Sequence, residues 1–191
     1  MPAKLITAPA TEPVTLAEAK LHLRVDPAST VEDALITSLI TAARQGAEQI
    51  TGRALMPQTW EIARDCFDGA LFLQRPPLVS VTSVTYLDAN GASQTLAPSA
   101  YVLDDYSEPA RLTPVAGACW PETLKQANSV TIRFQAGYAD AASVPQEIKT
   151  WMLLRLASLY ENRELFIADA RVAYVELPFD SLLDAYTVRS L

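Results

Sequence analysis

The sequence VPQEIKTWMLLRLASLYENRE, from Val144 to Glu164, predicts the helix around which the chain is organised. Ser143 can cap this helix, Pro145 loses no needed hydrogen bond in its first turn, and the Glu147 carboxylate meets the positive end of the helix dipole. Apolar side chains recur along it at spacings of three and four and form one broad face: Ile148, Trp151, Met152, Leu154, Leu156, Leu159 and Tyr160. Burial of this face requires other elements of the chain to pack against it.

Two earlier helices are predicted before residue 53. Thr15 and Glu18 form a T-x-x-E capping box, which starts a short helix at about 16–23. Ser29 and Glu32 repeat the pattern and predict the start of a second helix, which ends at Gly52 because glycine suits the left-handed turn there. The second helix carries one apolar stripe: Val31, Leu35, Ile36, Leu39, Ile40, Ala43, Ala47 and Ile50.

Between residues 58 and 140 the sequence predicts short β-strands. Residues 59–67 and 70–73 flank Asp68-Gly69 and indicate a hairpin, and residues 78–87 and 93–96 indicate a second hairpin around Gly91. Further strands are predicted at 100–103, 110–113 and 129–134.

We therefore predict an α+β fold: a small helical bundle formed by the N- and C-terminal helices, with an inserted antiparallel β-rich module. The predicted boundaries are 1–57 for the N-terminal helices, 58–140 for the β-rich insertion, and 141–191 for the long C-terminal helix with its tail. This is one helical core with an insertion.

Composition excludes several classes of protein. Half of the 191 residues are apolar, and the net charge of −7 supplies no overall basic field for binding nucleic acid. Cys66 and Cys119 are far apart and form neither a disulfide framework nor a zinc motif. With no signal peptide or membrane-span pattern, we expect a soluble chain from a reducing, intracellular compartment.

No catalytic, cofactor or metal site is predicted. His22 is the only histidine, and the familiar phosphate-binding, dinucleotide-binding, hydrolase and metalloprotease motifs are missing from the sequence. The acid pairs Asp65 with Asp68 and Asp104 with Asp105 fall in or beside predicted turns, where aspartate is favoured for local backbone hydrogen bonds. The sequence therefore predicts a protein that is not an enzyme.

The C-terminal tail is a short amphipathic segment. After Leu177-Pro178-Phe179 it places Leu182, Leu183 and Tyr186 on one side. Such a segment can dock on its own core or on another protein, and the residues alone leave both possibilities open.

The order and spacing of six motifs resemble the phage head-tail connector family of the HK97 gp6-like type. The narrower resemblance is to its gp8-like branch with a β insertion, and it covers nearly the whole chain. The motifs are VTLAEAKLHLRVD (14–26), EDALITSLITAARQGAEQITGR (32–53), RPPLVSVTSVTYLDANG (75–91), AGY (136–138), VPQEIKTWMLLRLASLYENRE (144–164) and LPF (177–179).

The resemblance implies a structural adaptor of a tailed phage or prophage, assembled in the host cytoplasm and located in the virion neck. About a dozen copies would form a ring under the portal, hold a stopper or tail protein below, and let DNA pass without specific binding. The family's C-terminal segment contacts the portal, which makes the following residues the candidate portal interface: Leu177, Phe179, Leu182, Leu183 and Tyr186.

Two alternatives to the adaptor remain at the level of sequence. One is a carbohydrate- or polymer-binding or cleaving phage protein that acts through its β module, with Asp65, Asp68, Asp104 and Asp105 as its only plausible acids. The other is a DNA-binding regulator, which the acidic balance disfavours.

Overall fold

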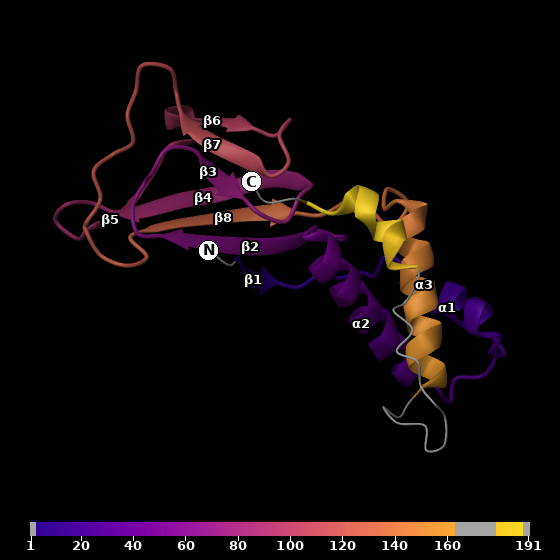
Figure 1. Ribbon diagram of the computed structural model, residues 1–191. Coiled ribbons are helices and arrows are strands. Elements are labelled where there is room, and N and C mark those ends of the chain that lie inside the picture. Colours follow the sequence, from indigo (N-terminus) through magenta and orange to yellow (C-terminus); the bar gives the residue numbers. More distant parts are fainter. Residues whose placement is uncertain (1–2, 163–178, 189–191) are drawn as a thin grey trace, which may run out of the picture. The chain divides into compact units, whose positions relative to one another are not determined.

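The computed structural model describes residues 3–162 and 179–188, which divide into two compact units (Figure 1). The β unit comprises the described parts of Met1–Ala10, Gly52–Ala139 and Val188–Leu191. The helical unit comprises the described parts of Thr11–Thr51 and Asp140–Thr187. The predicted α+β fold with a β-rich module between N- and C-terminal helices is confirmed.

The helical unit packs α1 (Leu16–Leu23), α2 (Asp33–Thr51), α3 (Gln146–Glu161) and the short 3-10 helix η2 (Asp180–Tyr186) against one another. Gly46 lets α2 approach α3 closely, because a Cβ at this position would lie 3.3 Å from the Trp151 ring. The predicted apolar faces of α2 and α3 meet in a core that contains Ile36, Ile40, Ala43, Ala47, Ile148, Trp151, Met152 and Leu156.

The helix starts agree with the sequence only in part. The Thr15–Glu18 capping box is confirmed: the Glu18 amide donates to Thr15 Oγ1 at 3.2 Å, and the Thr15 amide donates to Glu18 Oε2 at 2.7 Å. Gly52 has the predicted left-handed conformation, with φ 70°. Ser29 does not cap α2, because the helix begins four residues later, at Asp33. Ser29 lies in the preceding loop, where its carbonyl accepts a 2.6 Å hydrogen bond from Lys20 Nζ.

Two further details of the predicted helices are wrong. Val31, placed on the buried stripe, is 90% exposed, since it precedes the helix. Ser143 does not cap α3: its hydroxyl donates to Asp140 Oδ1 at 2.8 Å within a local turn, and Pro145 occupies the N-cap position.

The β unit contains two antiparallel sheets. The larger has the order β1-β2-β8-β4-β5, and the smaller has the order β3-β7-β6. In the larger sheet the strands are β1 (Lys4–Thr7), β2 (Gln58–Arg64), β4 (Leu78–Leu87), β5 (Ser93–Thr95) and β8 (Val130–Ala136). In the smaller sheet they are β3 (Leu71–Leu73), β6 (Tyr101–Asp104), which follows the 3-10 turn Pro98–Ala100, and β7 (Ala110–Pro114).

A shared apolar core joins the two sheets. Alternate residues of β2 and β8 are buried, as expected for strands with one face on a core. Leu71, Leu73 and Leu112 of the smaller sheet belong to the same buried cluster as Ile62, Ile132 and Phe134 of the larger one. The unit therefore has a hydrophobic core of its own.

The first predicted hairpin is wrong and the second is confirmed. β2 has β1 on one edge and β8 on the other, so neither edge is free for β3, which pairs with β7 in the smaller sheet. β4 and β5 pair as predicted, with Thr85 opposite Thr95. β1 is a strand that the sequence did not predict.

Candidate assembly surfaces

The described part of the C-terminal segment, 179–187, is held on its own helical unit, and Trp151 of α3 is the centre of the contact. Trp151 is 2% exposed, and its Nε1 donates to Asp180 Oδ1 at 2.7 Å. Phe179 meets the indole edge to face, with ring centroids 6.2 Å apart at 70°. An aromatic pair and a directed hydrogen bond thus fix the start of η2.

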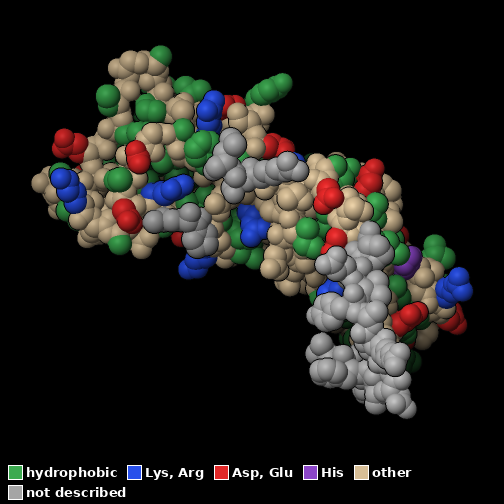
Figure 2. Space-filling model, viewed as in Figure 1, with side chains coloured by type: hydrophobic (Ala, Val, Ile, Leu, Met, Phe, Trp, Pro, Cys, Tyr) green, Lys and Arg blue, Asp and Glu red, His purple; other side chains and the backbone are tan. Residues whose placement is uncertain are grey.

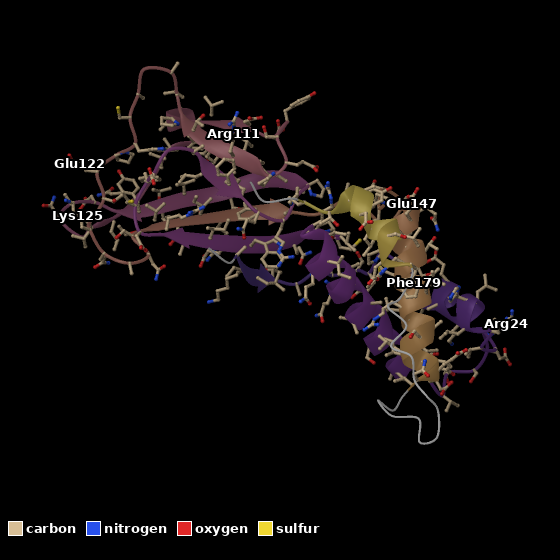
Figure 3. All side chains as sticks on the ribbon, in the orientation of Figure 1. Arg24, Arg111, Glu122, Lys125, Glu147 and Phe179 are labelled. Atoms are coloured by element: carbon tan, nitrogen blue, oxygen red, sulfur yellow. The ribbon has the colours of Figure 1, made fainter. Side chains whose placement is uncertain are left out.

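Tyr186 secures the other end of η2. Its hydroxyl donates to Glu147 Oε2 at 2.8 Å, and Glu147 lies in the first turn of α3 (Figure 3). Hydrogen bonds from the Glu147 backbone amide and from Tyr186 lower the pKa of the Glu147 carboxyl below its usual value, because both favour the ionised form. The carboxylate at the N-terminus of α3 therefore also serves as an acceptor for the tail.

The structure distributes the predicted portal-interface residues over two environments. Leu183 is fully buried in the helical unit, so its side chain offers no surface to a partner. Phe179, Leu182 and Tyr186 are partly exposed, and Leu177 lies outside the described residues. Contact with a portal stays a prediction for this segment, and the partly exposed side chains are the ones available for it.

A buried ion pair links the start of the helical unit to α2. Arg44 is 4% exposed; its Nε lies 2.7 Å from Glu12 Oε2 and its Nη1 lies 2.8 Å from Glu48 Oε2. Thr41 Oγ1 donates to the other Glu12 oxygen at 2.9 Å. Because Arg44 sits among the small apolar residues of α2, only its spacing of four from Glu48 hinted at this arrangement in the sequence.

The acids considered for catalysis have local structural contacts. Asp65 Oδ1 accepts the Asn128 amide at 2.9 Å, and Asp104 accepts hydrogen bonds from Ser107 and Arg111. Those bonds lower the pKa of Asp104, that from Ser107 having the largest effect. Asp68 and Asp105 are exposed in turns. Nothing in these contacts favours a hydrolytic role.

The β unit presents an open groove with an aromatic wall. Phe67 and Trp120 stack with ring centroids 4.8 Å apart at 10°, and Trp120 Nε1 donates to the Gly69 carbonyl at 2.8 Å. The groove has a volume of about 820 Å³, and Cys66 also lines it. Glu122 and Lys125, labelled in Figure 3, line it as well. Sequence reasoning missed it, because the loops 65–70 and 115–128 come together only through the two sheets.

Charged side chains form no single-sign field on the face shown in Figure 2, where Lys and Arg are scattered among Asp and Glu over both units. Within the described residues, no cluster of three or more His, Cys, Asp or Glu could hold a metal ion. A membrane-crossing helix is likewise missing from the part of the chain that the structure describes.

One family model and several solved structures are similar to this chain. Residues 13–75 match the family model described as phage gp6-like head-tail connector protein. The predicted resemblance to the gp6-like head-tail connector family is confirmed, and the narrower resemblance to its gp8-like branch stays a prediction. This head-tail connector match spans α1, α2, β2 and β3. No curated protein matches the chain.

Solved structures similar to the chain extend the likeness over its full length. A chain from the "Neck of empty GTA particle computed with C6 symmetry" matches with a TM-score of 0.80 and 25% identity, covering 100% of this chain and 98% of that one. A chain from the "Virion of native gene transfer agent (GTA) particle" matches with a TM-score of 0.79, 25% identity and the same coverage. A chain from the "Neck of native GTA particle computed with C12 symmetry" shares the fold, with a TM-score of 0.76 and 24% identity.

Proposed function

We propose that this protein is a structural head-tail connector that forms a ring in the neck of a tailed phage or phage-like particle. The observation that carries the proposal is the full-length match to a neck chain and to a virion chain of gene transfer agent particles, together with the separate connector match at residues 13–75. The same likeness supports a non-enzymatic, structural role. No observation favours the carbohydrate-active alternative.

The ring has about a dozen copies in this proposal. Support comes from the necks that contain similar chains, which were computed with C6 and with C12 symmetry. Because six divides twelve, one twelvefold ring is compatible with both symmetries.

The partners above and below the ring are the portal protein and a stopper or tail protein, and DNA passes through the centre. The net charge of −7 suits a conduit, because an acidic chain does not retain the phosphate backbone. On the portal side we assign the contact to the C-terminal segment of the chain, 179–187. Leu182 lies at its centre with Phe179 and Tyr186 beside it, since all three side chains keep exposed surface.

Native mass spectrometry of the full chain, alone and mixed with the portal protein encoded near it, tests the proposal. A complex with about twelve copies, formed alone or on the portal, is the expected result. A chain that stays monomeric and ignores the portal would refute the connector assignment.

The portal contact is tested separately with Leu182→Asp, which places a charge where a partner would bury it. We expect the variant to fold and to lose portal attachment. Ser181→Asp is the matched control, since it adds the same charge at the neighbouring exposed position. Retention of attachment by Leu182→Asp would exclude this face as the portal interface.

A further inference from the structure

The β unit displays one fully exposed aromatic side chain. Tyr106 is 97% exposed in the turn that joins β6 to β7. A single exposed apolar residue is ordinary on a protein surface, but tyrosine is among the residues that most often dominate protein interfaces. Tyr106 is a better candidate for contact with another protein if its turn is already ordered in the free chain.

Side chains of the turn and its flanking strands, together with Arg53, hold the turn in one conformation. Asp104 Oδ2 accepts hydrogen bonds from Ser107 Oγ at 3.0 Å and from Arg111 Nε at 2.9 Å. Glu108 is bound by Arg53, whose Nη1 donates to Glu108 Oε1 at 3.1 Å. A turn that is already ordered in the free chain loses less conformational entropy on binding, so a partner can contact Tyr106 with only a small entropy loss.

The aromatic groove lies at the opposite end of the same unit. Figure 1 shows the β6–β7 turn at one end of the smaller sheet, and Figure 3 places Glu122 and Lys125 of the groove at the far end of the unit. Its stacked wall of Phe67 and Trp120 offers flat apolar surface, and its volume of about 820 Å³ is within the range of sites that enclose a bulky side chain and its neighbours.

We propose that the Tyr106 turn of one copy occupies the groove of the next copy, and that this contact, repeated around the ring, joins the β units. A projection at one end and a matching hollow at the other make a head-to-tail contact, the type that closes rings. Exposed Asp105 beside Tyr106 and exposed Lys125 on the groove carry opposite charges. Asp65 and Glu122 also line the groove, so the docked turn must place Asp105 next to Lys125 and away from these two carboxylates. The inference rests on the proposed ring.

Cysteine cross-linking tests the contact, because Cys66 already lines the groove. Tyr106→Cys is made in the full chain with Cys119→Ser, which removes the second exposed thiol, and is treated with a short bis-maleimide under conditions where the ring forms. We expect a ladder of covalent multimers that disappears on adding Cys66→Ser. Val79→Cys, at a position that is 53% exposed in the same unit, is the matched control and should give no ladder.

Truncation of the side chain gives a second measurement. Tyr106→Ser should weaken copy–copy association about tenfold or more, whereas Tyr106→Phe should keep most of it, because the stacking face remains. A ring that forms normally with Tyr106→Ser, together with no cross-link between the Tyr106→Cys thiol and Cys66, overturns this inference and leaves the connector function standing. A chain that forms no ring alone or on the portal refutes the function and this contact together.

Discussion

Leu183 and Leu182 are adjacent in η2, but we expect their changes to alanine to lower stability by different amounts. Leu183 is fully buried, so Leu183→Ala removes about three carbon groups at ~0.8 kcal/mol each and leaves a cavity. We expect a loss of about 3 kcal/mol in the free energy of unfolding. Leu182 is partly exposed, and Leu182→Ala should cost about 1 kcal/mol or less.

Urea unfolding followed by helical circular dichroism measures the difference. With a slope of about 1–3 kcal/mol per M, Leu183→Ala should lower the midpoint by roughly 1–3 M and Leu182→Ala by a fraction of that. Equal effects, or a loss below about 1 kcal/mol for Leu183→Ala, would refute the packing of η2 on α3.

Because the C-terminal segment contributes Leu183 to the core, deleting it is a poor test of its role in assembly. Deletion of residues 177–191 would remove Leu183 from the core and leave Trp151 Nε1 without its Asp180 acceptor. Truncation would therefore confuse loss of stability with loss of a partner contact. Point changes at partly exposed positions, such as Leu182→Asp, separate the two effects.

Three further predictions concern stability. Arg44→Met should lower the free energy of unfolding by about 3–5 kcal/mol, because it removes the buried cation that lies between the Glu12 and Glu48 carboxylates. Arg133→Met, at the half-exposed pair with Glu61, should lower it by less than about 1 kcal/mol; urea unfolding measures both losses. Gly137→Ala should lower stability by more than about 4 kcal/mol, because its Cβ would lie 2.1 Å from the Met56 carbonyl oxygen. Gly69→Ala, which has open space around it, should lower stability by about 1–2 kcal/mol from its positive φ alone. A similar loss of thermal stability in both variants would contradict the clash at Gly137. The pKa of Glu147 is lower in the folded chain than its usual value of 4.5, so the ionised carboxylate stabilises the fold above pH 4.5, and this stability is lost as pH falls through the folded pKa. In Tyr186→Phe the urea midpoint should therefore fall less as the solution is acidified. An unchanged fall would exclude a contribution from this hydrogen bond.

Local patterns predicted the regular elements well. The Thr15–Glu18 capping box, the end of α2 before Gly52 and the β4–β5 hairpin all depend on residues close together in sequence. The errors at helix starts were local: α2 begins four residues after Ser29, and the Ser143 hydroxyl bonds Asp140 in a turn. The error in the sheet came from distant partners, since β3 pairs with β7 because both edges of β2 are occupied.

For the C-terminal segment as well, the sequence pattern did not say which partner the side chains contact. Its amphipathic pattern placed Leu182, Leu183 and Tyr186 on one side, but periodicity is the same for a segment that packs on its own chain and for one that packs on another protein. Leu183 is buried against the helical unit, and Tyr186 is bonded to Glu147 of α3. The assignment of these side chains to the core or to a free surface required the tertiary contacts.

The amino-acid sequence by itself determined the helices and most strands, the α+β class and the resemblance to head-tail connectors, because caps, turns and apolar periodicity are properties of neighbouring residues. Only the tertiary structure decided which strands share a sheet, that Arg44 is buried between two carboxylates, and that Phe67 and Trp120 form one groove wall. Those contacts join residues that are far apart in the chain. Their energies depend on burial and geometry, which cannot be predicted from the sequence of neighbouring residues.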